Sequence, residues 1–260
     1  MISEDSRTSG TGVGLNARGA LLFGRYAFPP NQLGYCGPED NQALLEYVST
    51  RTVDKGLLEL ERRFEGAYPY LCLIAQANHI ADPFDERVVE AYWVGNGLLE
   101  RVDAATFYDS LNRRFRPRMK AADFRWLASK LELSARPHHN FHVFDIYTRG
   151  GLMRDERASI ALKPMDSCRI SWGRVVEVGA SQLQVERQPI VLEAGKLALG
   201  KTEIRSVKRQ QNGLGFVDQV QAGAIVSIHW DWACEGLDER RYGRLRAATL
   251  KYLEIANQTI

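Results

Sequence analysis

The sequence predicts an α+β fold, in which a helical N-terminal domain is followed by a small β-barrel and a C-terminal helix. Apolar residues recur with helical spacing from residue 40 to residue 133. After residue 167, short strand-like runs are separated by turns rich in Gly and Asn, a pattern typical of a small barrel. The last stretch, 238–256, returns to a helical pattern.

These changes in pattern divide the chain into three parts. Residues 1–16 are rich in Ser, Thr and Gly and are expected to form a flexible tail. Residues 17–162 are expected to form a mostly helical domain, and residues 163–260 the barrel domain with its C-terminal helix. A chain of 260 residues, 45% of them hydrophobic, is long enough to bury a sizeable core.

The first ordered segment, residues 23–38, alternates aromatic residues with Gly and Pro. Pro29 and Pro30 are expected to prevent a continuous helix, so we interpret the segment as an ordered loop. Cys36 lies in a Gly-Tyr-Cys-Gly-Pro turn of this loop. Residues 28–38 are a candidate docking surface for a partner.

Helices are expected next, because caps and apolar stripes recur together. Asp40 can cap a first helix, and Asp82-Pro83 gives a cap followed by proline at the first helical position. Asp103 is expected to begin another helix, and residues 122–133 complete the helical pattern.

Three of the five histidines lie in His138-His-Asn-Phe-His142. The alternation in residues 136–148 predicts a strand, in which His138 and His142 share one face while His139 and Asp145 share the other. One interpretation is a polar strand near the domain seam. The alternative is a metal site, for which zinc would need further ligands.

Barrel strands are predicted at 170–178, 182–185, 190–192 and 224–230. Cys168 opens the first of these strands and His229 ends the last. The first and last strands of a closed barrel can be neighbours, so the thiol and the imidazole can meet at one rim. Such a pair suits either a soft metal such as iron or a cysteine nucleophile activated by a base.

The residues around this pair carry a resemblance to a known family. Cys168 is followed by Trp172-Gly173 and Arg174-Val-Val-Glu177, and Gly223-Ala-Ile-Val-Ser-Ile-His229 is followed by Trp232-Ala233. With the helical stretch behind them, residues 165–256 resemble the HypC/HupF family of nickel–iron hydrogenase assembly chaperones. In that family Pro-Gly stands where this chain has Trp172-Gly173, and the Cys becomes the N-terminal residue, whereas Cys168 is internal.

The resemblance implies a small OB-like barrel that carries iron with cyanide and carbon monoxide ligands, the Fe(CN)2CO group. It implies that Cys168 and His229 are the residues that hold this iron. It also implies two partners, the hydrogenase large-subunit precursor and a HypD-type maturation protein.

We therefore expect an accessory chaperone of hydrogenase maturation rather than an enzyme. Cys168 and His229 are its expected cofactor-binding and metal-binding residues, with His138, His139, His142 and Cys36 as secondary candidates. The first alternative is a metal-dependent enzyme that acts on a small ligand or a precursor in the same pathway. The sequence has no P-loop, no HExxH motif and no CxxC pair.

Charge and composition limit the remaining functions. With 34 Lys and Arg against 32 Asp and Glu, the chain is close to neutral, which does not favour a nucleic-acid binder. Arg205, Lys208 and Arg209, with Trp230 and Trp232 for base stacking, still leave an OB-type nucleic-acid-binding module as the second alternative.

The sequence also predicts where the protein works. It contains no run of about 18 apolar residues, and its first residues lack the apolar core of a secretory signal. We expect no membrane span and a cytoplasmic location, with the four cysteines as reduced thiols.

Overall fold

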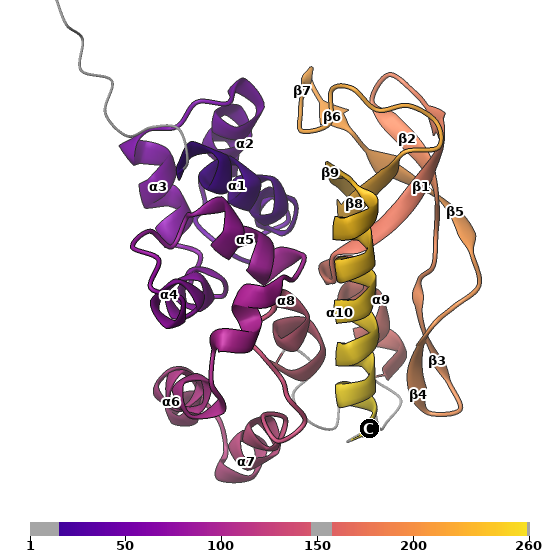
Figure 1. Ribbon diagram of the computed structural model, residues 1–260. Coiled ribbons are helices and arrows are strands. Elements are labelled where there is room, and N and C mark those ends of the chain that lie inside the picture. Colours follow the sequence, from indigo (N-terminus) through magenta and orange to yellow (C-terminus); the bar gives the residue numbers. More distant parts are fainter. Residues whose placement is uncertain (1–15, 147–157, 259–260) are drawn as a thin grey trace, which may run out of the picture.

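The computed structural model describes residues 16–146 and 158–258, which form a helical half packed against a strand-rich half (Figure 1). The predicted α+β class, with helices first, then strands and a final helix, is confirmed. The predicted tail lies outside the described residues, except that Asn16 already begins the first helix. Within the described part of the chain, no helix is both long and apolar enough to cross a membrane.

The elements follow one another in two groups. The helical group comprises α1 (Asn16–Gln32), α2 (Asn41–Thr50), α3 (Lys55–Arg62), α4 (Tyr68–Ala77), α5 (Glu86–Trp93), η1 (Gly97–Arg101), α6 (Ala104–Phe115), η2 (Arg116–Arg118), α7 (Ala121–Ser129), α8 (His139–Phe141), η3 (His142–Ile146) and α9 (Ala158–Cys168). The second group comprises β1 (Ser171–Val178), β2 (Gln182–Arg187), β3 (Ile190–Glu193), β4 (Lys196–Leu199), β5 (Glu203–Lys208), β6 (Gln210–Gln211), β7 (Leu214–Gly215), β8 (Ile225–His229), β9 (Trp232–Leu237) and α10 (Glu239–Asn257).

Helix α1 corrects the prediction of a loop over residues 23–38. The helix continues to Gln32 with Pro29 and Pro30 in its last turn, and only the residues after it are irregular. A proline in a helix loses one hydrogen bond and crowds the preceding turn. That penalty is outweighed here because α1 buries almost its whole length, with Phe23 and Tyr26 fully inside the core.

Five strands form a closed barrel in the order β1-β2-β5-β9-β8, and β1 also pairs with β8. Neighbouring strands are antiparallel, except that β5 and β9 meet in parallel where Lys208 lies opposite Trp232. The predicted strand 190–192 corresponds to β3, which lies outside the barrel and forms a separate hairpin with β4. Strand β9 was not predicted. Most of its side chains are buried, so its sequence lacks the alternation of apolar and polar residues that indicates a strand.

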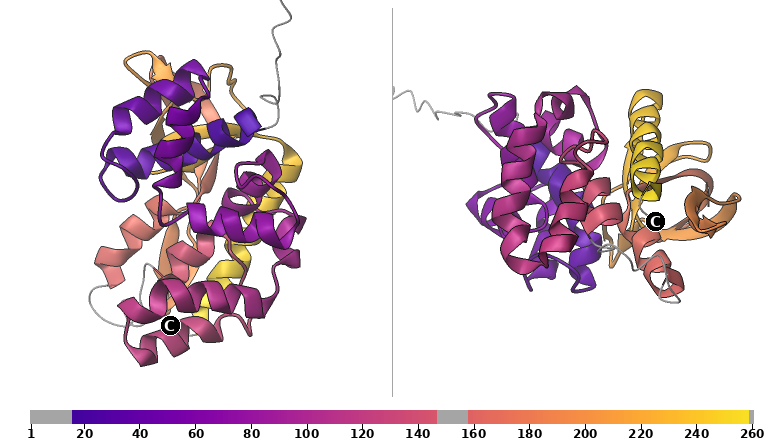
Figure 2. Two further views of the ribbon diagram at one scale, coloured as in Figure 1. Left: turned by 90° about the vertical axis from the view of Figure 1, so that its left-hand side faces the viewer. Right: turned by 90° about the horizontal axis from the view of Figure 1, so that it is seen from below.

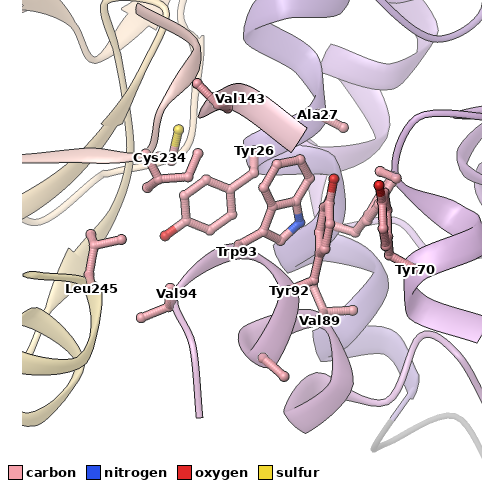
Figure 3. Packing of buried hydrophobic residues seen from close by; sticks show 14 of the residues in the cluster. Tyr26, Ala27, Tyr70, Val89, Tyr92, Trp93, Val94, Val143, Cys234 and Leu245 are labelled. Carbon is pink, nitrogen blue, oxygen red and sulfur yellow. The ribbon is translucent and has the colours of Figure 1, made fainter. Parts of the chain in front are cut away.

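One hydrophobic core continues from the helices into the barrel. Tyr26 of α1 and Trp93 of α5 stack at 5.4 Å between ring centroids, and the Tyr26 side chain extends toward Cys234 of β9 (Figure 3). The Tyr26 hydroxyl donates a hydrogen bond to the carboxylate of Glu235, also on β9. Helix α10 runs along this seam and contacts α8, η3, β4 and β9 (Figures 1 and 2). The two halves therefore share their packing rather than each having a core of its own.

Glu61 of α3 is a fully buried carboxyl group beside α1. A Cβ atom built on Gly24 would lie 3.1 Å from its Oε1 atom, so the carboxyl packs against the bare backbone of α1. Among the described residues, neither of its oxygens has a hydrogen-bond partner. Burial raises the pKa of Glu61 well above its ordinary value, and the contact with the Gly24 backbone offsets only part of that effect.

Replacing Glu61 with glutamine is expected to stabilise the protein increasingly as the pH rises. The carboxyl group of the unfolded chain ionises at about pH 4.3, while that of the folded chain holds its proton to higher pH. The native state therefore binds more protons above that pH, and wild-type stability falls as the pH rises. Glutamine carries no such proton. Urea unfolding at pH 4 and at pH 8 should show a stability advantage of E61Q over the wild type that is larger at pH 8.

The matched control is Glu59→Gln, which removes an exposed carboxyl group from the same helix. This variant should differ from the wild type by a similar amount at both pH values. An E61Q advantage that is the same at pH 4 and pH 8 would contradict the prediction.

Candidate functional site

His139, Cys168 and His229 come together where the helical half meets the barrel. One ligand atom from each residue lies within 4.8 Å of the other two. Cys168 and His229 were expected to meet at one barrel rim, and the structure brings them together because β1 and β8 are paired, with Ser171 opposite Ile228. In one detail the expectation was wrong: Cys168 is the last residue of α9 and does not open β1.

The histidine segment is helical, which corrects the predicted strand over residues 136–148. His139 begins the short helix α8, and His142 begins the π-helix η3. Helical spacing puts residues three apart on one side, so His139 and His142 line the same cavity while His138 lines another. The alternation was misleading because almost every side chain from 138 to 146 is buried. The part of the predicted strand beyond residue 146 lies outside the described residues.

Asp145, the expected neighbour of His139, is not part of the cluster. Its carboxylate lies 3.2 Å from the Lys130 ammonium group, and both side chains are fully buried. Burial raises the pKa of Asp145 to about 6, and Lys130 offsets part of that effect. This pair belongs to the packing of α7 against η3.

The three clustered residues open into a cavity of about 90 Å³. Its wall is mainly aromatic and apolar, with the polar groups of the cluster as its main exception. The lining residues are Ala27, Pro30, Tyr35, Cys36, Phe64, Gly66, Ala67, Tyr92, Trp93, His139, His142, Cys168, His229 and Trp230. A cavity of this size has room for a metal ion with a few small ligands, or for several water molecules.

The orientation of His229 is set by the two prolines of α1. Its Nδ1 atom lies 2.6 Å from the Tyr26 carbonyl oxygen and donates a hydrogen bond to it. Helical partners for that carbonyl would be the N–H groups three and four residues on, but these positions are Pro29 and Pro30, which have none. With the proton on Nδ1, Nε2 carries a lone pair. This buried atom has no hydrogen-bond partner in the described part of the chain.

His139 is held by two contacts of its own. Its Nε2 atom lies 2.8 Å from the Cys168 carbonyl oxygen and 4.0 Å from the Cys168 Sγ atom. Its Nδ1 atom lies 3.3 Å from the Tyr92 hydroxyl group. Since a carbonyl oxygen only accepts, Nε2 donates to it and Nδ1 accepts from Tyr92. His139 must give up the carbonyl contact to bind a metal through Nε2, whereas His229 is already free to bind.

The protonation states of the three clustered side chains are compatible with metal binding. Burial lowers the pKa of His229 to about 4, an effect offset in part by the nearby backbone carbonyl groups of Tyr26 and Cys168, and burial lowers the pKa of His139 as well. Burial raises the pKa of the Cys168 thiol to about 12. Both imidazoles are therefore neutral at pH 7, the form that binds metals, and the thiolate forms when a metal displaces its proton.

The loop after α1 forms part of the wall of the cavity. Tyr35 stacks on Trp230 with 4.3 Å between ring centroids, and Cys36 lines the cavity beside them. The loop is anchored by Asn31, whose amide donates to the carbonyl oxygens of Cys36 and Pro38 at 2.7 and 2.6 Å. The secondary candidates Cys36, His139 and His142 thus share one cavity with the two primary ones.

Trp230 reaches this position from a strained turn. Trp230 and Asp231 form the two-residue turn between β8 and β9, and both have positive φ angles, of 47° and 61°. Such turns favour Asn and Gly, and a bulky residue rarely adopts this conformation. Two contacts hold the turn in place. The backbone N–H of Trp230 donates a hydrogen bond to the backbone carbonyl oxygen of Ser167. The side chains of Arg205 and Asp231 form an ion pair at 2.7 Å. Backbone strain of this kind is typical of functional sites.

Sequence reasoning did not assign Tyr35, Trp230 or Trp93 to the site. Trp230 was considered only for base stacking, together with Trp232. That expectation does not hold for Trp232, which is 2% exposed and lies beneath Phe28 and Phe216. The Gly-Tyr-Cys-Gly-Pro turn was the one signal that could have pointed to Tyr35.

A family model supplies the comparison that identifies the chain. The model of DUF6390, a family of unknown function, matches residues 15–260. The chain belongs to the DUF6390 family. The match spans both halves, so the DUF6390 unit includes the cluster and its cavity. Neither the curated proteins nor the solved structures gave a match.

Proposed function

We propose that this chain is an accessory chaperone of nickel–iron hydrogenase maturation that holds iron, with its cyanide and carbonyl ligands, as cargo at Cys168 and His229. It acts in the cytoplasm and binds rather than converts its cargo. The observation that carries the proposal is the buried Nε2 atom of His229, which has no hydrogen-bond partner among the residues that the structure describes and lies in the same cluster as the Cys168 thiol.

The chemistry of the cluster supports a soft or borderline metal. A thiolate is a soft ligand and an imidazole a borderline one, and both suit low-spin iron. His139 is close enough to serve as a third ligand after a small adjustment. The apolar wall of the cavity limits the access of water to a bound group, which favours the retention of cyanide and carbonyl ligands.

The architecture supports the same proposal. The closed five-stranded barrel with a C-terminal helix suits an OB-like domain. Cys168 precedes its first strand and His229 ends β8, so both ligands lie at one rim. A rim position lets a cargo leave without unfolding the barrel.

The proposed partners are the hydrogenase large-subunit precursor and a HypD-type maturation protein. Leu33 and Tyr35 are exposed apolar residues of the loop after α1, at 52% and 56% exposure, and Tyr35 lines the cavity. An acceptor that docks on them would face the cluster across the stacked rings of Tyr35 and Trp230. Transfer then requires the loop after α1 to move aside.

The test is anaerobic purification from cells that express a complete hydrogenase maturation system, followed by infrared spectroscopy. We expect cyanide and carbonyl stretches on the wild type and on Cys72→Ala, which removes a half-buried thiol outside the cavity. The stretches should be lost in Cys168→Ala and in His229→Ala. A silent spectrum with the precursor still co-purifying would remove the cargo role. A silent spectrum with no hydrogenase partner would overturn the proposal.

A second candidate function is that of a metal-dependent enzyme, and the presence of three clustered ligand residues favours it. Catalytic zinc sites use three protein ligands and keep one position open for water or substrate, and His139, Cys168 and His229 supply three. Zinc that remains bound through dialysis in one equivalent, with no infrared bands, would favour the enzyme over the chaperone.

A further inference from the structure

A second cavity, of about 310 Å³, lies between the segment after α5 and the middle of α10. It is separate from the Cys–His cavity, although the adjacent residues His138 and His139 face one cavity each. Its lining residues are Gly95, Asn96, Gly97, Leu99, Glu100, Arg136, His138, Arg244, Ala247, Ala248, Lys251 and Tyr252. The proposed metal site makes no use of this cavity.

The charged groups around this cavity are mostly basic. Arg136, Arg244 and Lys251 line it, against the single carboxylate of Glu100. Arg136 lies 3.7 Å from Glu100, and because the Glu100 side chain is exposed, this ion pair is weak. Lys251 has no ion pair with any residue that the structure describes. The cavity therefore carries a net positive charge.

Arg244 is only partly neutralised by its neighbour. Its guanidinium group lies 3.4 Å from Glu90, but that carboxylate is shared with Arg241 at 3.5 Å. Arg241 has a closer partner in Glu235, at 2.6 Å, so the two guanidinium groups are balanced by two carboxylates. The Arg244–Glu90 contact is long and Arg244 is 35% exposed, so this ion pair is weak and leaves guanidinium N–H groups for a further anion. Arg244 and Lys251 lie on the same helix.

The floor of the cavity adds a buried hydrogen-bond donor. The Nδ1 atom of His138 accepts a hydrogen bond from the Asn140 N–H at 3.0 Å, so the ring proton is on Nε2. His138 is fully buried, and its Nε2 makes no hydrogen bond of good geometry in the described part of the chain, although the Val94 backbone carbonyl lies near the ring. A Cβ atom on Gly95 would lie 3.6 Å from Nε2. Because Gly95 has a φ of +99°, which disfavours side chains, the space above Nε2 stays open.

We propose that this cavity binds the phosphate group of a small phosphorylated organic molecule. The surplus of positive charge complements a doubly negative phosphate, and guanidinium groups match its oxygen atoms in geometry. The apolar part of the lining, Leu99, Ala247, Ala248 and Tyr252, offers a surface for the organic group. The proposal is independent of the metal site, since no residue lines both cavities.

Isothermal titration calorimetry of the full chain at low ionic strength tests the ligand class. The probes are glycerol 3-phosphate, inorganic phosphate and acetate. We expect glycerol 3-phosphate to bind more tightly than inorganic phosphate, and acetate to bind at least about tenfold more weakly than either, because it carries one charge. Absence of phosphate binding, or acetate binding as tightly as phosphate, would overturn the proposal.

Variants on α10 locate the site. Lys251→Gln and Arg244→Gln should each weaken glycerol 3-phosphate binding about tenfold, the effect of losing one charged hydrogen bond. Arg246→Gln is the matched control, because it removes an exposed positive charge from the same helix outside the cavity. It should leave the affinity unchanged. If all three variants weaken binding equally, the phosphate is attracted by the general charge of the helix and the proposal fails.

Discussion

Replacing Pro30 with alanine is expected to weaken metal binding about 10- to 100-fold, the range found for residues that orient a metal-binding histidine. The new N–H at position 30 would donate to the Tyr26 carbonyl oxygen, which now accepts from His229 Nδ1 at 2.6 Å. His229 would then share the carbonyl oxygen with this second donor, which weakens the contact that keeps its proton on Nδ1. Anaerobic titration with Co(II), followed by its thiolate absorption band, measures the loss.

Pro29→Ala is the matched control for this experiment. Its new N–H lies in register with the Arg25 carbonyl rather than with that of Tyr26, so His229 keeps its partner. We expect the affinity of this variant to stay close to that of the wild type. Equal losses in both variants would mean that the prolines act by shaping helix α1 and not by freeing one carbonyl.

Replacing Trp93 with alanine is expected to lower the free energy of unfolding by about 3–5 kcal/mol. The indole ring packs against the rings of Tyr26, His139 and His229, with 5.4, 4.6 and 5.8 Å between ring centroids. It therefore connects the helices, the histidine segment and the barrel. Its removal leaves a cavity that these rigid neighbours cannot close. Urea unfolding followed by far-UV circular dichroism and by the fluorescence of the remaining tryptophans measures the loss.

A control variant distinguishes the contribution of the seam between the two halves from that of ordinary side-chain packing. The two probes should report one transition in the wild type, because the core is continuous across the halves. Trp126→Ala is the control, since Trp126 is half-buried on α7, away from the cluster, and should cost less. A loss in W93A no larger than that in W126A would show that the seam contributes little to stability.

The order of elements and the meeting of Cys168 with His229 could be predicted from the sequence. Strand patterns of period two are readable in β1 and β2, where buried and exposed side chains alternate over part of each strand. Closure of the barrel then brings the rim residues of β1 and β8 together. Function was assigned at this stage by resemblance alone, and it stays a prediction.

From the helical half, His139, His142 and Cys36 were secondary candidates, but the way in which this half positions them could not be predicted. His139 was predicted to lie on the opposite face of a strand from His142, whereas the segment is helical and both residues line one cavity. The segment is buried on almost all sides, so its sequence shows no helical periodicity. Helix α1 was missed because proline rules describe isolated helices, whereas Phe23 and Tyr26 gain enough from burial to tolerate Pro29 and Pro30. The role of Tyr26 as the acceptor for His229 depends on a contact between residues 203 positions apart.

The wide spacing of the cluster along the chain has a consequence for protein synthesis. The acceptor carbonyl is in α1, His139 and Cys168 come from the middle of the chain, and His229 ends β8. The ribosome releases the N-terminal parts first, so an emerging chain holds an incomplete set of ligands until β8 has left the exit tunnel. Under the proposed function, only a chain that has folded through β8 presents all three ligands to a metal, and the nascent chain does not.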